Sequence, residues 1–224
     1  MRIRIKFAKK SAVQYLGHLD IMRFFQRSFN RADVKMEYSI GYNPHQKMSF
    51  AQPLGVGIIS CGEYLDAEIA AGQDLEEIRR RLNEVCGDGF EVLSVKALPD
   101  DAKKAMAALR YARYRVDVRG LEAGDLLTRA INDLLAEKEI LVTKTTKSGS
   151  REVDIRPQIV KLTCEDGVLS MTLTAASDNN LKPDTLTREI IQKTGIEYQR
   201  EKVTIKREEL YAEDFVPLEQ FQTL

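Results

Sequence analysis

The two histidines of the chain stand in one basic, aromatic stretch and are its best candidates for proton-transfer chemistry. His18 lies in the sequence GHLD, and His45 ends the glycine- and proline-containing loop GYNPH. An imidazole titrates near neutral pH, so either side chain could act as a general acid or base, or donate to a phosphate. Asp20 could instead cap a helix, and His18 could bond a backbone carbonyl. A purely structural role therefore stays open for His18 and Asp20.

Other kinds of reactive site are not indicated. His18, Asp20 and His45 could offer three metal ligands, but they lack the local spacing of a metal motif. No nucleophile elbow, phosphate-binding glycine loop or dinucleotide fingerprint is present. The three cysteines are far apart and odd in number, which indicates small buried side chains and no disulfide framework or zinc module. We therefore predict no metal site and no cofactor.

Cations and aromatic rings near the histidines indicate a second kind of chemistry, contact with RNA. Three arginines step by four residues along one helical stripe, away from the apolar positions. Cations hold phosphates and rings stack on unpaired bases, as binding of single-stranded RNA requires. A solvated helix face or loop is the commoner explanation of such charges. The predicted RNA- or partner-binding residues are Arg23, Arg27, Arg31, Tyr42, His45, Lys47, Lys147 and Arg151.

The elements that must position these side chains follow from hydrophobic periodicity. Residues 2–8 alternate between basic and apolar, which predicts a strand with Arg2, Arg4 and Lys6 on one face, a face that could stay free of helices. Helical spacing predicts helices over 20–32, 74–85, 121–136 and 183–193. Alternation and turn signals predict further strands over 34–40, 47–51, 63–69, 90–97, 112–118, 140–145, 152–162, 168–175 and 202–210.

This order predicts an α+β protein built from two tandem ferredoxin-like (βαββαβ) domains, each an antiparallel sheet with its helices on one face. The expected N-terminal domain covers 1–98 and holds the GHLD and GYNPH motifs. A linker follows, then a C-terminal domain over 107–212 with a basic hairpin, and a tail over 213–224. Basic and acidic segments alternate twice along the chain, which also favours an internal duplication.

Composition limits the location and the partners. The 34 basic and 34 acidic residues give a net charge of zero, which argues against a plain nucleic-acid-binding protein unless the charges separate locally. No run of residues is apolar enough to span a membrane, and the N-terminal stretch MRIRIKFAKK lacks the hydrophobic region of a signal peptide. We therefore expect a cytoplasmic protein that does not contact membranes.

Four segments carry a resemblance to a known family. The stretch RIRIKFAKKSAVQYLGHLD, its continuation through GYNPHQKMSFAQPLGVGIISCGEYLD, and the later SREVDIRP and NLKPDTL segments resemble the bacterial radical-SAM-associated (radical-SAM-linked) proteins, an uncharacterised domain-of-unknown-function family. The resemblance implies a protein encoded beside, or fused to, a radical-SAM protein. The chain has no CxxxCxxC motif, so the partner would hold the iron–sulfur cluster.

Three functions are compatible with these patterns. The first is a non-catalytic RNA-binding or substrate-presenting partner of a radical-SAM enzyme, acting on tRNA or rRNA. The second is a metal-independent endoribonuclease that uses His18 or His45 as general acid or base. The third is a protein–protein docking module whose GYNPH loop binds the radical-SAM protein without RNA contact. Only the second is an enzyme, so we expect that the chain is not one.

Overall fold

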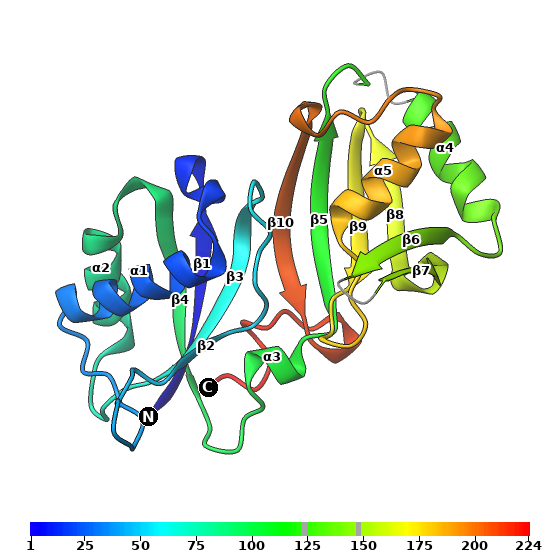
Figure 1. Cartoon of the computed structure of the whole chain (residues 1–224). Coiled ribbons are helices and arrows are strands. Elements are labelled where there is room, and N and C mark those ends of the chain that lie inside the picture. Colours follow the sequence, from blue (N-terminus) through cyan, green and yellow to red (C-terminus); the bar gives the residue numbers. More distant parts are fainter. Residues whose placement is uncertain (122–124, 147–148) are drawn as a thin grey trace. The chain divides into compact units, whose positions relative to one another are not determined.

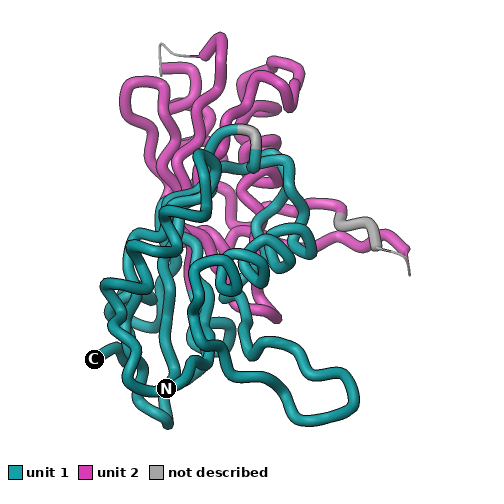
Figure 2. Tube along the Cα trace, turned by 90° about the vertical axis from the view of Figure 1, so that its left-hand side faces the viewer, with its two compact units in different colours: residues 1–110, 207–224 teal, residues 111–206 magenta. Residues whose placement is uncertain are grey.

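The computed structural model describes residues 1–121, 125–146 and 149–224, and it divides the chain into two compact units. Unit 1 comprises Met1–Arg110 together with Arg207–Leu224, and unit 2 comprises Tyr111–Lys206 (Figure 2). The expected boundaries were 1–98 and 107–212, with a separate tail. The structure differs because the segment 207–224 groups with unit 1. Both units mix helices with antiparallel strands, so the chain is an α+β protein.

Unit 1 follows the order strand, helix, two strands, helix, strand. Its strands lie in the order β4-β1-β3, with β2 also paired to β3, and every one of these pairs is antiparallel. Helices α1 and α2 cover one face of this sheet (Figure 1). The bounds are β1 (Arg2–Lys9), α1 (His18–Arg31), β2 (Met48–Phe50), β3 (Ile59–Glu68), α2 (Leu75–Cys86), β4 (Phe90–Leu98) and α3 (Ala105–Ala108).

The core of unit 1 forms where the alternation of β1 meets the helical stripes. Ile3, Ile5 and Phe7 point to the same side of β1 and are buried with apolar side chains of α1 and α2. The ring of Phe7 meets that of Phe25 edge-on, with centroids 4.7 Å apart. Such aromatic contacts add to the free energy gained by burying the rings, and they fix α1 against the sheet.

The opposite face of β1 is also covered, which the sequence did not predict. Arg4 is buried, and its guanidinium donates to Asp66 and to the carbonyls of Leu218 and Phe221. Lys6 pairs with Glu209 and Glu219 at 2.8 and 3.0 Å. The expectation of a free basic face is therefore wrong for unit 1, because β3 and the segment 207–224 supply partners for these cations.

Unit 2 repeats a similar order with one addition. Strand β5 lies between β9 and the N-terminal part of β10, and β8 pairs with β9. Strands β6 and β7 form a separate hairpin between α4 and β8 (Figure 1). The bounds are β5 (Tyr111–Val118), α4 (Asp125–Ala136), β6 (Leu141–Thr146), β7 (Gly149–Asp154), β8 (Ile159–Glu165), β9 (Val168–Thr174), α5 (Pro183–Lys193) and β10 (Val203–Tyr211).

Two predicted strands are replaced by other structure. The strand expected over 152–162 is broken into β7 and β8, because Asp154 accepts from the backbone N–H groups of Ile140 and Arg156 and the chain turns there. The strand expected over 34–40 contributes only two isolated bridges, at Met36 and Tyr38. Short 3-10 turns complete the chain at Ser11–Tyr15, Gly87–Gly89, Arg156–Gln158, Arg200–Lys202 and Glu213–Phe215. Among the described helices, none combines the length and apolar character that crossing a bilayer requires.

Candidate nucleic-acid interface

Helix α1 begins two residues earlier than predicted, at His18, and this changes the position of the first histidine. Gly17 is the N-cap residue, and Asp20 lies in the first turn. A carboxylate at this position is stabilised by the positive end of the helix dipole. The His18 ring packs edge-on against Phe50, with centroids 5.2 Å apart. His18 is therefore partly buried against an apolar neighbour at the start of the helix.

The arginine stripe of α1 is exposed, as the periodicity predicted. Ile21, Phe25 and Phe29 face the core, which leaves Arg23, Arg27 and Arg31 on the solvent side of the helix. Arg23 approaches Asp20 at 3.9 Å through largely exposed side chains, a pair worth little in water. Within the described ranges, neither Arg27 nor Arg31 forms an ion pair, so both guanidinium groups face solvent.

A long hairpin over residues 33–48 is fastened to this helix at its base. Gln46 is buried, and its amide donates to Asn30 Oδ1 at 2.8 Å and to the Gln26 carbonyl at 3.4 Å. Gln26 and Asn30 lie on the flank of α1 between the buried stripe and the arginines. The hairpin therefore projects from the body of unit 1 directly beside the side of α1 that carries the arginines.

The upper part of the hairpin is closed by Ser39 and His45. The Ser39 backbone N–H donates to the His45 carbonyl at 2.9 Å, and the His45 backbone N–H donates to Ser39 Oγ at 3.1 Å. Ser39 Oγ also lies 2.9 Å from His45 Nδ1, so this ring nitrogen is engaged within the loop. His45 is exposed, and its Nε2 is the ring atom left to meet a ligand.

Beyond this closure, the tip presents apolar and aromatic groups to solvent. Ile40 and Tyr42 are fully exposed, and Tyr38 is about half exposed. Gly41 has a φ of +140°, a conformation that residues with a side chain rarely adopt, so the tip depends on glycine at this position. The side chains of Ile40 and Tyr42 therefore bury no surface against the rest of the chain.

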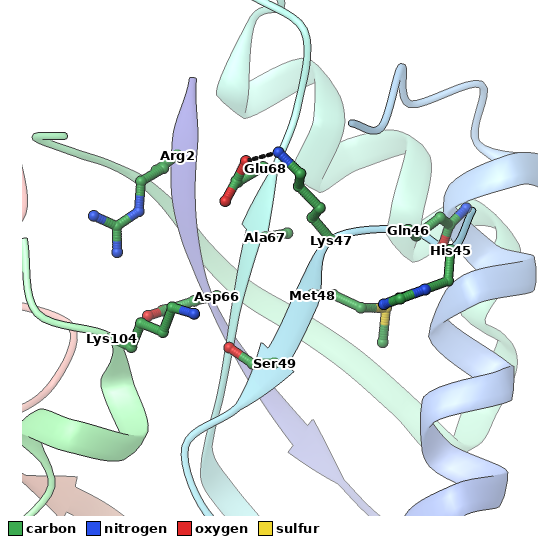
Figure 3. Close-up of a pocket in the computed structure, with 10 residues that line it drawn as sticks. All are labelled: Arg2, His45, Gln46, Lys47, Met48, Ser49, Asp66, Ala67, Glu68 and Lys104. Carbon is green, nitrogen blue, oxygen red and sulfur yellow. Dashed lines mark hydrogen bonds and ion pairs between the residues drawn. The ribbon is translucent and has the colours of Figure 1, made fainter. Parts of the chain in front are cut away.

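A pocket of about 310 Å³ opens beside the base of the hairpin (Figure 3). Lys47 donates to Glu68 at 2.8 Å, and both side chains are about 40% exposed. This hydrogen bond lowers the pKa of the Glu68 carboxyl, and the charges of Lys47, Arg2 and Lys104 lower it further. The residues that line the pocket are Arg2, His45, Gln46, Lys47, Met48, Ser49, Asp66, Ala67, Glu68 and Lys104.

The predicted residues that belong to unit 1 therefore lie in three places. His45 and Lys47 line the pocket, Tyr42 lies at the hairpin tip, and the three arginines form the outer stripe of α1. Sequence reasoning missed Lys104 and Glu68 as pocket residues. Lys104 fell in the expected linker, where composition gives no sign of its neighbours. Glu68 fell on a strand face whose partners come from elsewhere in the chain.

The remaining predicted residues belong to unit 2. Arg151 is exposed on β7, in the hairpin that β7 forms with β6. Lys147 lies outside the described residues. The predicted role of this hairpin in RNA binding remains a prediction.

The structure shows different surroundings for the two histidines. His18 contacts an apolar ring, whereas His45 bonds a serine hydroxyl. In the part of the chain that the structure describes, no three His, Cys, Asp or Glu side chains are grouped as a metal site would require.

Comparisons with known proteins gave one family and a distant structural likeness. A family model described as "Uncharacterized protein conserved in bacteria (DUF2344)" matches residues 2–183. No curated protein matches the chain. A solved structure described as "Crystal Structure of a Cbf5-Nop10-Gar1 Complex" matches with a TM-score of 0.49 at 12% sequence identity. That match covers 95% of this chain and 50% of the other, so this chain spans about half the length of the protein it resembles.

Proposed function

The chain belongs to the bacterial family DUF2344, and from the geometry of unit 1 we propose that it is a non-catalytic RNA-binding protein. One observation carries the proposal: a hairpin with a fully exposed aromatic tip is fastened to the arginine-bearing side of α1 through Gln46. The tip offers Tyr42 for stacking on an unpaired base. The stripe offers guanidinium groups for the phosphates on either side of it.

The charge distribution supports this assignment despite the neutral total. Arg27 and Arg31 lack carboxylate partners among the described residues, whereas Arg79 and Arg80 of α2 are paired with glutamates of the same helix. Unpaired guanidinium groups on one helix face make a local positive potential that attracts a polyanion. A neutral protein with such a stripe binds nucleic acid through that stripe and not through its whole surface.

We further propose that the protein presents tRNA or rRNA to a radical-SAM enzyme. This rests on the sequence resemblance of the GHLD, GYNPH, SREVDIRP and NLKPDTL segments. We also propose that both units are ferredoxin-like. The strand orders β4-β1-β3-β2 and β10-β5-β9-β8, each interleaved with two helices, support this classification.

The RNA-binding proposal is tested with an arginine double variant and a matched control. Arg27→Ala/Arg31→Ala removes two unpaired cations from α1, and Arg79→Ala/Arg80→Ala removes two paired ones from α2. Affinity for single-stranded RNA is measured by fluorescence anisotropy over a range of salt concentrations. We expect the α1 variant to bind more weakly and to reduce the salt slope by about 1.4, since each single-strand phosphate contact contributes roughly 0.7. Unchanged affinity and slope would overturn the assignment, and the α2 variant should resemble the wild type.

The contacts support the endoribonuclease alternative for His45 and not for His18. General acid–base catalysis needs a polarised or oriented group within reach of the reacting atoms. His18 faces Phe50, and His45 is held by Ser39 at an exposed loop. Incubating the purified protein with single-stranded RNA tests this alternative. Cleavage that His18→Ala or His45→Ala abolishes would establish it.

The docking alternative is favoured by the same exposed tip. Ile40 and Tyr42 could bury their side chains against a protein as well as against RNA. Co-purification of a partner that survives ribonuclease treatment and is lost on Tyr42→Ala, without RNA affinity of the isolated protein, would favour docking.

A further inference from the structure

We propose that the pocket beside the hairpin binds a phosphomonoester, with Lys104, Lys47 and Arg2 around the phosphate and Glu68 as a built-in counter-ion. Lys104 and Arg2 lie on one side of Glu68 in Figure 3, and Lys47 lies on the other. Where the ligand is the end of an RNA chain, this inference rests on the proposed function. Where it is a free phosphate ester, it stands alone.

The charges of the pocket leave room for a dianion. Three cations line it, Arg2, Lys47 and Lys104, together with the carboxylates of Asp66 and Glu68. Asp66 is already neutralised, because the buried Arg4 donates to both of its oxygens. Glu68 alone therefore faces three cations, which leaves two positive charges. A phosphomonoester carries about −1.5 to −2 at neutral pH, whereas a phosphodiester carries one charge.

Lys104 is the side chain best placed to meet an incoming anion. It is exposed, and within the described ranges its ammonium makes no hydrogen bond or ion pair. Arg2 fixes the segment that carries Lys104, because its Nη1 donates to the carbonyls of Asp100 and Ala102, both at 2.8 Å. The backbone leading to Lys104 is thus held before any ligand arrives, which reduces the entropy lost on binding.

Lys47 and Glu68 supply a contact that can be exchanged. Both side chains are partly exposed, so their ion pair can open toward solvent at little cost. A phosphate that enters the pocket can accept from Lys47 in place of Glu68, and the Ser49 hydroxyl on the same wall can donate to it. The carboxylate then opposes binding, so it should select against weakly charged anions and keep the pocket clear of them.

The size of the pocket limits the ligand to a small one. Its volume of about 310 Å³ lies at the lower end of the roughly 300–1,000 Å³ found for small-molecule sites. A terminal phosphate with its sugar fits this scale, whereas a folded RNA does not. The ligand is therefore either the phosphorylated end of an RNA or a free mononucleotide, and the chemistry recognised is the same.

Anisotropy and calorimetry distinguish these two sources. One RNA sequence is labelled internally and prepared with a 5′-phosphate, a 3′-phosphate or no terminal phosphate, and adenosine 5′-monophosphate is titrated separately by calorimetry. If the ligand is an RNA end, we expect the phosphorylated RNA to bind about tenfold more tightly than the same RNA without a terminal phosphate, the size of one charge-assisted contact. If the ligand is a free ester, we expect saturable binding of the mononucleotide. Lys104→Ala should abolish that gain, and Lys10→Ala, which removes an exposed lysine paired with Glu91, should not.

The Glu68→Gln variant tests the counter-ion role, and it should change phosphate affinity in the direction opposite to Lys104→Ala. Removing the negative charge while keeping a side chain of similar size should raise phosphate affinity several-fold. A preference for phosphorylated RNA would assign the RNA end, and binding of the mononucleotide alone would assign a free ester. Equal binding of all RNAs with no saturable binding of the mononucleotide would overturn the pocket proposal. That result would leave RNA binding itself to be decided by the Arg27→Ala/Arg31→Ala variant.

Discussion

Arg4 and Asp66 are joined by two hydrogen bonds, from Nε to Oδ1 at 2.8 Å and from Nη2 to Oδ2 at 3.1 Å, and both side chains are almost completely buried. The backbone N–H of Ala105 donates to the same carboxylate at 2.7 Å. The guanidinium also donates to the carbonyls of Lys103, Leu218 and Phe221. One ion pair thus connects β1, β3, the α3 segment and the C-terminal segment of unit 1.

Removing this arginine should destabilise the protein strongly. We expect Arg4→Ala to lower the free energy of unfolding by about 3–5 kcal/mol, because it leaves a buried carboxylate and several carbonyls without their partner. Urea unfolding of the whole chain measures this change. The control is Lys10→Ala, which breaks the exposed pair with Glu91 and should cost less than about 1 kcal/mol. Equal losses in the two variants would contradict the role given to Arg4.

Gly62 is required by the close approach of β3 to β10. A Cβ atom at this position would lie 2.7 Å from the Glu208 carbonyl carbon, and backbone cannot move away as a flexible side chain can. We expect Gly62→Ala to cost roughly 1–3 kcal/mol or more, as overpacking in a closed site does. Gly17→Ser is the matched control, because its nearest neighbour lies at 3.6 Å and serine is a good N-cap residue. A Gly62→Ala protein as stable as the control would contradict so close an approach of the two strands.

Tyr42 should contribute to RNA affinity and not to stability. Its side chain is fully exposed, so Tyr42→Ala should leave the melting temperature unchanged. Loss of one base-stacking contact should weaken RNA binding by about 1–3 kcal/mol. Tyr42→Phe should retain most of the affinity, since the ring supplies the stacking surface. Tyr15→Ala removes another exposed tyrosine, at 67% exposure, and should bind RNA like the wild type. Weakening by both alanine variants would show a nonspecific effect.

The carboxyl group of Glu68 should titrate below its ordinary pKa of 4.5, because Lys47 donates to its ionised form and nearby cations outweigh the effect of burial. A depressed pKa in the folded state means that this contact stabilises the protein above pH 4.5. The contribution is lost as the pH falls through the folded-state value. Carbon-detected NMR titration of the carboxyl group measures the midpoint. It should rise toward 4.5 in Lys47→Ala, and an unchanged midpoint would show that Lys47 is not the cause.

Periodicity predicted the positions of helices and strands better than it predicted the contacts of their side chains. Pro183 and the apolar stripe after it gave both ends of α5, and Asp74 caps α2 through the Glu77 N–H as expected. Alternation also identified β1 as a strand, but it assigned the basic side to solvent. Arg4 lies 214 positions from Leu218, whose carbonyl it contacts, and no local pattern can indicate that partner.

The candidate site was predictable where it is local in sequence. The arginine stripe of α1, the exposed GYNPH loop and the pocket residues His45 and Lys47 all lie within one stretch of the chain. The rest of the pocket is not local, because Lys104 reaches it from the α3 segment and Glu68 from β3. Their meeting depends on strand pairing and on the contacts of Arg2, which only tertiary structure reveals.

The division of unit 1 between two stretches of sequence has a consequence for synthesis on the ribosome. The sheet of unit 1 contains β1 at the start of the chain, but Leu218 and Phe221, which cover Arg4, are translated after the whole of unit 2. At about 5–20 residues per second, the 96 residues of unit 2 take roughly 5–20 s to translate. During this interval the nascent unit 1 carries an uncovered arginine–aspartate pair on its sheet. Unit 1 can therefore complete its fold only after the whole of unit 2 has been translated.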